Sequence, residues 1–455
     1  MAKNYSRKEL KKIHFIGIGG VSMSALSLHL KNLGYEVSGS DSAESLTLQS
    51  LRKKGIKVYD RHRSSNVNNV DAVCYTSAIS LNNCELKKAI KKKLPIYKRS
   101  EILGKILSKF DNSIGVSGCH GKTTATAMIA DALIVANKNP TVFLGGENKN
   151  FGNYLMGDEK ICLAEACEFK KNFLDIKPKI SVVLNIDKDH MDSYDDESDL
   201  ISAYSQFVVG SISVINADDP LCEKIHNSTS VTFGINNLAT YSARNVKFNG
   251  IGYTFTAYAY SMKLGTVKLS VIGKHNVYNA LATIAVCDLL KIPFSKVKLA
   301  LENFTGVKRR AEYLGSVNNL DYYADYAHHP KEIMATVKAF SYLDKPMTVV
   351  FQPHTYSRTK YLMQEFIDAL KEIDNLIIYS TYPAREKFDL LGDAKTLYQN
   401  LKKEKDCFYA FNEKELANRI KEISIGNACV LFLGAGDIYD IAKKLLNETD
   451  KANKK

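Results

Sequence analysis

The chain has 455 residues, a length that corresponds to about three domains of ~150 residues. Hydrophobic residues make up 45% of it and charged residues 24%, with 26 glycines and 9 prolines, which excludes disordered, collagen-like and low-complexity proteins. No run of ~18 apolar residues is uninterrupted, so the sequence predicts no transmembrane helix.

The net charge of +13 favours anionic partners. The densest lysine group, within residues 87–93, lies on one predicted helix face without interleaved aromatic residues, so phosphorylated small molecules fit better than nucleic acid. The nine cysteines stand singly, without C-x-x-C spacing, as in a reducing compartment. Residues 13–30 follow a basic start but lack a signal-peptide cleavage site. We expect a cytoplasmic monomer or homodimer that binds no membrane.

The first section begins with a predicted strand at residues 13–18, a glycine-rich turn and an apolar-periodic helix. Further strands at 36–39, 56–59, 72–75 and 95–97 alternate with short helices, which is typical of a parallel sheet. The turn carries, in order, Gly17, Gly19, Gly20, Ser22, Met23 and Ser24. Asp41 ends the next strand, where dinucleotide sites place a ribose-binding acid. Ser22 replaces the third glycine of that fingerprint, so the turn is compatible with a pyrophosphate site or a purely structural role.

The second section opens at residue 113 with a strand, a glycine-rich loop and a helix over 123–136. The loop runs Gly-Val-Ser-Gly-Cys-His-Gly-Lys-Thr-Thr over residues 115–124. Phosphate binding needs converging backbone N–H groups, a helix N-terminus, a lysine and a hydroxyl for Mg²⁺, and this loop supplies all four. Its spacing departs from the standard Walker pattern, because Val116 stands where a glycine is needed. We predict an ATP loop here.

Acidic residues follow two strand-like segments of this section. Glu165 and Glu168 follow the first, and Asp187, Asp189, His190 and Asp192 follow the second, at residues 180–185. Strand ends lie at the same sheet edge as the phosphate loop, where Glu165 and His190 could hold Mg²⁺ against polyphosphate. For Glu168 and Asp192 a solvated loop position is the favoured interpretation.

Three clusters come later in the chain. After a β-rich stretch at 230–272, a helix over 276–290 opens with His275, Asn276 and Asn279, which suit a base edge. A third section, from about residue 310, repeats the strand-helix alternation, with strands at 348–351, 376–379 and 430–433 and a helix marked by Leu362, Phe366 and Leu370. Its histidine clusters, at residues 325–330 and 353–359, indicate a carboxylate or phosphate site.

Together these motifs resemble the ATP-dependent Mur ligases of peptidoglycan synthesis. The family order is kept in the segments IHFIGIGG (13–20), GYEVSGSD (34–41), HGKTT (120–124), EACE (165–168), GKHNVYNA (273–280), DYAHHP (325–330) and FQPHTYSRT (351–359). The resemblance implies an α/β fold with a Rossmann-like UDP-sugar-binding domain (1–107), a P-loop-type central ATPase domain (108–310) and a Rossmann-like C-terminal amino-acid-binding domain (311–455). The first segment favours members that join L-alanine to UDP-N-acetylmuramate through an acyl phosphate. A muropeptide-recycling ligase or a later Mur ligase is the alternative.

The resemblance also implies site residues, with ATP and Mg²⁺ as cofactors. ATP would be held by Gly118, Cys119, His120, Gly121, Lys122, Thr123, Thr124, His275, Asn276, Asn279 and Arg310, and Mg²⁺ by Thr123, Glu165 and His190. The UDP sugar would lie at the Gly17–Ser24 turn and at Asp41, His62, Ser77, Ala78 and Ile79, and the amino acid at Tyr326, His328 and Arg358. The catalytic residues would be Lys122, Glu165, His190, His328 and Arg358. Cys119 replaces a usual threonine, and Ala311 and Thr355 also depart from the family pattern.

Two other classes of protein remain to be weighed. An NAD-dependent oxidoreductase could use the Gly17 turn, but hydride transfer needs no phosphate-transfer lysine such as Lys122. A non-catalytic nucleotide-binding regulator would leave Glu165, His190 and the histidine clusters without a use. Both are therefore disfavoured against a ligase.

Overall fold

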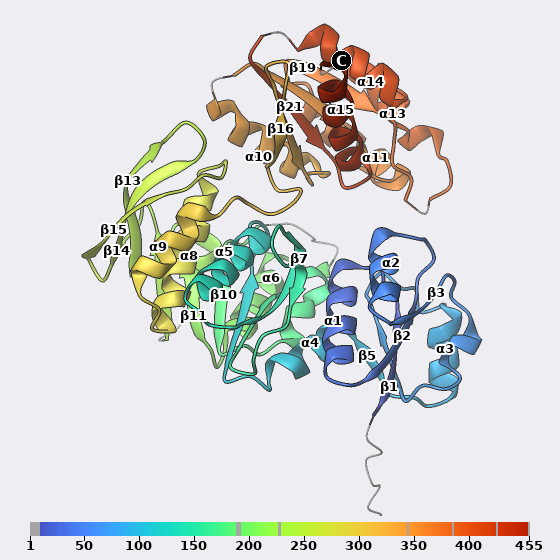
Figure 1. Ribbon diagram of the computed structural model, residues 1–455, viewed down its shortest axis with the longest axis vertical. Helices are drawn as coiled ribbons and strands as arrows, with labels where there is room; N and C mark the ends of the chain where they lie inside the picture. The colour runs from blue at the N-terminus through green and yellow to red at the C-terminus, as the bar shows by residue number, and fades with distance from the viewer. Residues whose placement is uncertain are drawn as a thin grey trace, which may run out of the picture. The chain divides into compact units, whose positions relative to one another are not determined.

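The structure, a computed structural model, describes residues 10–187, 193–225, 229–343, 345–384, 386–424 and 426–453 (Figure 1). By its internal contacts the chain divides into two compact units, which are described separately here. The first comprises residues 1–247, 254–269 and 275–304, and the second residues 248–253, 270–274 and 305–455. The described residues form sheets of five, ten and six strands, and this confirms the predicted α/β class.

The five-stranded sheet is parallel, in the order β3-β2-β1-β4-β5. Because the chain leaves the central strand β1 toward β2 and returns to β4 on its other side, the carboxyl ends of β1 and β4 form a switch point, where open α/β sheets bind ligands. The predicted strand at 13–18 ends early, at Ile16, because Gly17 turns the chain with φ +83°. The elements are β1 (Lys12–Ile16), α1 (Val21–Asn32), β2 (Glu36–Ser40), α2 (Leu46–Lys53), β3 (Lys57–Tyr59), η1 (Ser64–Val67), β4 (Ala72–Tyr75), α3 (Cys84–Lys91), β5 (Ile96–Lys98) and α4 (Arg99–Leu107).

The ten-stranded sheet has the order β15-β14-β13-β12-β11-β10-β6-β9-β7-β8. Its centre is parallel and buried, with β6 between β10 and β9, whereas the hairpins β14–β15 and β7–β8 are antiparallel. Helix α5 follows β6 and packs against α8 and α9. The strands are β6 (Asn112–Ser117), β7 (Thr141–Asn148), β8 (Gly152–Leu155), β9 (Ile161–Glu165), β10 (Ile180–Val183), β11 (Ile212–Asn216), β12 (Ser230–Gly234), β13 (Tyr241–Phe248), β14 (Tyr253–Ala259) and β15 (Met262–Lys268). The helices are α5 (Lys122–Val135), η2 (Phe169–Asp175), α6 (Glu197–Val208), α7 (Pro220–Glu223), α8 (His275–Leu289) and α9 (Phe294–Asn303).

The six-stranded sheet of the second unit has the order β16-β17-β21-β18-β19-β20, and only the β16–β17 pair among its ladders is antiparallel in the described residues. The single helix predicted around Leu362 is two helices, because Leu362 has φ −105° and ψ 25°. The elements are β16 (Glu312–Val317), β17 (Leu320–Asp325), α10 (Pro330–Phe340), η4 (Ser341–Leu343), β18 (Met347–Phe351), α11 (Tyr356–Tyr361), α12 (Met363–Leu370), β19 (Asn375–Tyr379), η5 (Leu390–Gly392), α13 (Ala394–Leu401), β20 (Phe408–Ala410), α14 (Glu413–Ile423), β21 (Ala428–Leu433) and α15 (Ile438–Asn453). No helix in the described ranges is long and apolar enough to cross a membrane.

The two sheets of the first unit are joined by close packing of α4 on η2. A Cβ at Gly104 of α4 would lie 2.0 Å from the backbone oxygen of Asp175, so only glycine fits there. Beside it, Ser100 Oγ donates a hydrogen bond to Asp175 Oδ2 at 2.6 Å. A single buried apolar cluster extends from the first sheet into the second, with Phe15 and Phe173 among its members. The two sheets therefore share a core, and a second, smaller cluster around Val67 and Val73 lies within the first sheet's part of the unit.

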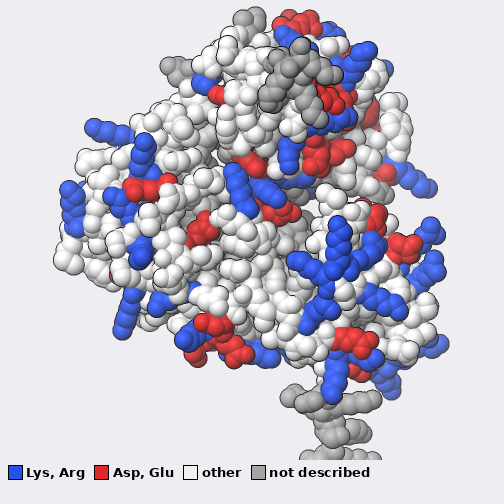
Figure 2. Space-filling view, viewed as in Figure 1, with Lys and Arg blue, Asp and Glu red and all other residues white. Residues whose placement is uncertain are grey.

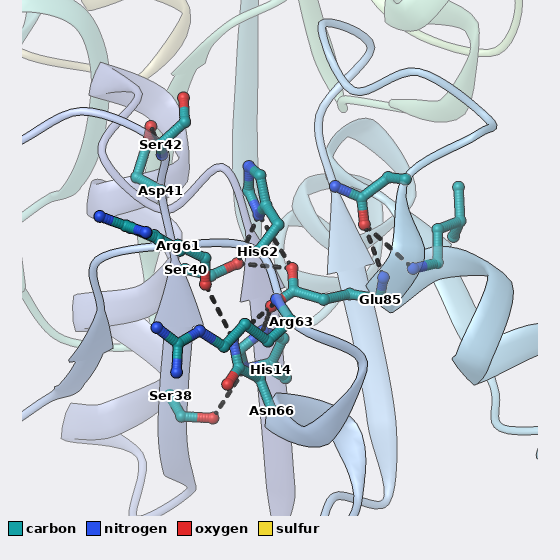
Figure 3. Close-up of polar contacts among 12 residues, drawn as sticks. His14, Ser38, Ser40, Asp41, Ser42, Arg61, His62, Arg63, Asn66 and Glu85 are labelled. Carbon is teal, nitrogen blue, oxygen red and sulfur yellow. Dashed lines mark hydrogen bonds and ion pairs between the residues drawn. The ribbon is translucent and has the colours of Figure 1, made fainter.

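A buried carboxylate ties together the elements of the first sheet (Figure 3). Glu85 of α3 is fully buried and accepts hydrogen bonds from Ser40 Oγ at 2.6 Å, Asn66 Nδ2 at 2.6 Å and His62 Nδ1 at 3.0 Å. His14 Nε2 of β1 lies 3.5 Å from its other oxygen, Oε1. Burial alone would raise the pKa of Glu85, but the bonds from His14, His62 and Ser40 outweigh it and hold the pKa well below its ordinary value of 4.5.

We predict that Glu85→Gln destabilises the first unit in a pH-dependent way. The carboxylate contributes stability above its unfolded-state pKa, near 4.5, and this contribution is lost as the pH falls through the lower folded-state value. At pH 7 the loss should be ~2 kcal/mol, the range of hydrogen bonds to a charged group, and it should shrink toward pH 3. Urea unfolding followed by circular dichroism at both pH values measures it, with Glu36→Gln, an exposed partner of Lys12, as the control. An equal loss at both pH values would contradict the prediction.

Candidate functional site

The loop between β6 and α5 has the shape that anion binding requires. Gly118 and Gly121 have φ of +136° and +85°, a region that favours glycine, and α5 begins directly after Gly121. Asn185, just beyond β10, fixes the loop, because its Oδ1 accepts from His120 N at 2.9 Å and its Nδ2 donates to His120 O at 3.0 Å. Cys119 Sγ lies 3.1 Å from Asp187 N, so the thiol connects the loop to the chain beyond β10. The free helix N-terminus thus faces the carboxyl edge of the sheet.

Lys122 lies inside this loop and is paired with a buried carboxylate. Its Nζ donates to Glu168 Oε1 at 2.9 Å and to the backbone oxygens of Gly118 and Cys119 at 2.5 and 3.2 Å. Burial would lower the pKa of Lys122, but the charge of Glu168 holds it above its ordinary value. The predicted solvated position of Glu168 is wrong, because the residue is only 1% exposed. Its Oε2 is buried and has no hydrogen-bond partner within the described ranges.

Glu165, the last residue of β9, lies directly beside Thr123. Its Oε2 accepts from Thr123 Oγ1 at 3.1 Å, and its Oε1 accepts from Gly145 N at 2.5 Å. A carboxylate and a hydroxyl are the oxygen ligands that Mg²⁺ prefers, so this pair fits the predicted metal. The described residues contain no group of three or more His, Cys, Asp and Glu side chains placed to hold a metal. His190, the third predicted ligand, and Asp189 and Asp192 lie outside the described residues.

The predicted adenine-binding residues lie at the start of α8, next to the loop. Asn276 and Asn279 are buried, and Asn279 Nδ2 donates to Asn276 Oδ1 at 2.9 Å. A Cβ at Gly121 would lie 2.9 Å from Asn279 Oδ1, so the amide borders the phosphate loop. His275 is exposed, at the first position of the helix. The structure thus brings the loop, Thr123, Glu165 and these amides to one edge of the sheet.

The turn after β1 forms a second candidate site in the first unit. Asp41 is buried, and its oxygens accept from Gly19 N at 3.0 Å and Ser42 N at 2.8 Å. These bonds make Asp41 a support of the turn, a role that the sequence prediction did not include. Met23 and Ser24 are also buried, in the first turns of α1. The N-terminus of α1, from Gly20, opens at the switch point of the sheet.

Charged and polar side chains from segments far away in the sequence lie around the turn that follows β1. Arg99 Nη1 donates to Ser22 Oγ at 2.9 Å, which no sequence motif indicated. His62 is held through Nδ1 by Glu85, while Ser77 and Ala78 are exposed in the loop after β4. Lys170 Nζ donates to Ser77 O at 3.4 Å. Figure 2 shows many Lys and Arg side chains over this part of the molecule, as expected for a site that takes an anionic ligand.

In the second unit, the predicted residues lie at the carboxyl ends of β17 and β18. His328 Nδ1 is 2.9 Å from Tyr326 O, and its ring lies 5.2 Å from the Tyr326 ring and 5.7 Å from the His354 ring. Arg310 is exposed, with its guanidinium 5.5 Å from the Tyr326 ring centroid. Among the described residues, Arg358 Nη1 and His354 Nδ1 are buried and have no hydrogen-bond partner. A guanidinium nitrogen is always a donor, so buried Arg358 Nη1 calls for an acceptor such as a carboxylate.

Three consecutive family models match the chain. They are the Mur ligase family, catalytic domain, at residues 12–111, the Mur ligase middle domain at residues 116–287, and the Mur ligase, glutamate ligase domain at residues 309–436. The words "glutamate ligase" belong to the name of the third family model and do not identify a substrate of this chain.

Curated relatives and solved structures match over nearly the full length. A UDP-N-acetylmuramate–L-alanine ligase from Aquifex aeolicus is 38% identical, covering 98% of this chain and 99% of that one, and one from Clostridium beijerinckii is 38% identical over 98% and 100%. The crystal structure of UDP-N-acetylmuramate-alanine ligase MurC from Thermotoga maritima has a TM-score of 0.83 at 30% identity and covers 97% of this chain and 99% of that one. A murein peptide ligase from Psychrobacter arcticus shares the fold, with a TM-score of 0.72 at 21% identity. Since the three family models match in order and the full-length relatives are 38% identical, the chain belongs to the Mur ligase family.

Proposed function

We propose that this protein is an ATP-dependent ligase that joins L-alanine to the lactyl carboxylate of UDP-N-acetylmuramate in peptidoglycan precursor synthesis. The observation that carries the proposal is the 38% identity, over nearly the whole of both chains, to relatives of that name. The likeness to the murein peptide ligase, at 21% identity, concerns the fold alone and does not favour that alternative. We assign the UDP sugar to residues 1–107, ATP to residues 108–310 and the amino acid to residues 311–455.

The reaction converts a poor electrophile, a carboxylate, into an acyl phosphate that the amine of L-alanine attacks. Negative charge gathers on the transferring phosphoryl group, so the groups aimed at it matter most. In this proposal Lys122 leaves Glu168 Oε1, 2.9 Å away in the present structure, and contacts the phosphate. The N–H groups of residues 118–124 hold the remaining phosphate oxygens at the N-terminus of α5.

Mg²⁺ would be held by Thr123 and Glu165, which already adjoin at 3.1 Å, and by His190 as the family resemblance implies. When bound, such an ion offsets negative charge on the phosphates and on the carboxylate. The hydrogen bond from Gly145 N keeps the Glu165 carboxylate in place. In this proposal Asn276 and Asn279 present their amides toward the adenine base.

The second unit supplies the amino acid in this proposal. Arg358 Nη1, which is buried and has no partner in the part of the chain that the structure describes, suits the carboxylate of L-alanine. Tyr326 and His328 border the same strand ends. In the first unit, the Gly17–Ser24 turn with Arg99 takes the pyrophosphate of the UDP sugar, and His62 and residues 77–79 lie toward the uridine. We place the reaction in the cytoplasm, without nucleic-acid or membrane partners, in a monomer or homodimer; the nine free cysteines support a reducing compartment.

Phosphate release from ATP tests the function directly. With UDP-N-acetylmuramate present, we expect release to require L-alanine, with serine and glycine as weaker substitutes. A tripeptide offered in place of the amino acid tests the recycling ligase, and NAD offered without ATP tests the oxidoreductase. Release with the tripeptide and not with L-alanine would reverse the assignment.

Replacing Lys122 with alanine should lower the turnover rate about a hundredfold or more, because electrostatic contacts to a developing charge are commonly worth ~3 kcal/mol. The change also leaves the buried Glu168 charge without its partner, which destabilises the fold. The double variant Lys122→Ala/Glu168→Gln separates the two effects, since it should restore stability but not rate. Lys138→Ala, exposed just beyond the far end of α5, is the matched control. Near wild-type turnover in folded Lys122→Ala would refute the role of this lysine.

Replacing a metal ligand should shift the Mg²⁺ requirement. In Glu165→Gln, and in His190→Ala, we expect a higher Mg²⁺ concentration at half-maximal rate, and partial recovery of the rate at excess metal. A residue that only supports the fold would lower the melting temperature and leave this midpoint unchanged. Asp111→Asn, exposed before β6, is the control. An unchanged midpoint in both variants rules out the ligand assignment.

A further inference from the structure

A cavity of about 320 Å³ lies in the first unit, away from both strand edges that carry the candidate sites. Its walls include Leu30 of α1 and Leu33 directly after that helix, Ile102 and Ile106 of α4, and Met156 of the segment after β8. This lining is mostly apolar. The volume is that of a small ligand-binding pocket, at the lower end of the usual ~300–1,000 Å³.

One polar side chain in the wall has an unused hydrogen-bonding atom. His29 of α1 is only 3% exposed and lines the cavity, and its Nδ1 lies 3.0 Å from the Tyr154 hydroxyl. The edges of its ring contact Phe143 and Tyr154 at centroid distances of 5.2 and 5.8 Å. Within the part of the chain that the structure describes, Nε2 has no hydrogen-bond partner. Since Tyr154 occupies Nδ1, Nε2 is the ring nitrogen that remains for a guest in the cavity.

The contact with Tyr154 indicates that Nε2 is a donor. A phenol O–H is a stronger hydrogen-bond donor than the N–H of a neutral imidazole, so in the 3.0 Å contact the Tyr154 hydroxyl donates to His29 Nδ1 and the ring proton resides on Nε2. Burial, aided by the positive charge of Lys109, lowers the pKa of His29 to about 4. The ring is therefore neutral at physiological pH and presents one N–H group to the cavity.

The charges around the cavity balance. Lys105 and Lys109 of the wall are matched by Asp158 and Glu159, and Lys105 Nζ lies over the Tyr97 ring at 4.6 Å. A charged guest of either sign would therefore be attracted by two of these side chains and repelled by the other two. A neutral guest fits this charge distribution best.

We propose that this cavity is a binding site for a neutral, largely apolar small molecule that offers one hydrogen-bond acceptor, such as a carbonyl oxygen, to His29 Nε2. The apolar body lies between α1 and α4, and the acceptor points toward the ring of His29. The site is separate from the nucleotide loop and from the Gly17 turn. Binding braces α1 and α4, the helices joined by the Arg99–Ser22 bond at their N-terminal ends.

A solvatochromic naphthalene ketone, 6-propionyl-2-(dimethylamino)naphthalene, tests the proposal, because it is neutral, apolar and carries one carbonyl acceptor. Titrated with the full chain, its emission should shift to the blue and saturate at one molecule per chain. Saturating UDP-N-acetylmuramate and ADP should not displace it. Displacement by either would place the probe in a nucleotide site and overturn the proposal, as would the absence of a saturable shift.

Two variants locate the bound probe. His29→Phe removes the N–H and keeps an aromatic ring, and should weaken binding about two- to tenfold, the range of one net hydrogen bond. Leu33→Trp, 41% exposed at the end of α1, should fill the cavity and weaken binding more than tenfold without repacking the core. Leu299→Trp on α9, 48% exposed and outside the cavity lining, is the matched control and should bind like the wild type. Equal affinity of Leu33→Trp and Leu299→Trp refutes the site even if His29→Phe fails to fold.

Discussion

The buried pair of Lys122 and Glu168 is the interaction on which the proposed nucleotide site depends. A lysine in this loop must keep its charge while it is removed from water, and an unpaired buried ammonium would lose its proton instead. Glu168 prevents that, and in the proposed function an incoming phosphate takes its place beside Lys122. Because Glu168 Oε2 has no hydrogen-bond partner among the described residues, the carboxylate depends on Lys122 for its stabilisation. In the proposed function the phosphate that draws Lys122 away must therefore outweigh this pairing.

The geometry around this pair follows from parallel strands. Because β6, β9 and β10 run side by side in the same direction, the residues that follow them meet at one edge even though they are far apart in the sequence. Glu165, Asn185 and the loop glycines come together there. The first sheet repeats the arrangement with the Gly17 turn, and the second unit repeats it with Tyr326 and Arg358. One rule of sheet topology therefore positions all three candidate sites.

The sequence predicted those features whose signal is local. Strand, turn and helix are contiguous at Gly17 and at Gly118, and the periodicity of α5 and α8 placed their ends within a residue or two. It did not predict contacts between residues far apart in the chain. The Arg99–Ser22 bond spans 77 residues and the Asn153–Ser24 bond 129, and no pattern in either segment encodes the partner. The sequence also did not predict the burial of Glu85 and Glu168. No local pattern distinguishes an acidic residue that is buried with partners from one that is exposed on the surface.

The absence of a side chain at Gly104 has a consequence for how the first unit can evolve. Any larger residue there would push α4 away from η2, and the N-terminus of α4 carries Arg99 to the Gly17 turn. A substitution at this packed position of α4 would therefore move the Arg99 cation at the proposed sugar site. Position 104 should tolerate no replacement in sequences that keep this interface, whereas the exposed face of the same helix should vary freely. Selection for substrate binding then acts on Gly104, which has no functional group, through the space that its missing side chain leaves for the backbone of Asp175.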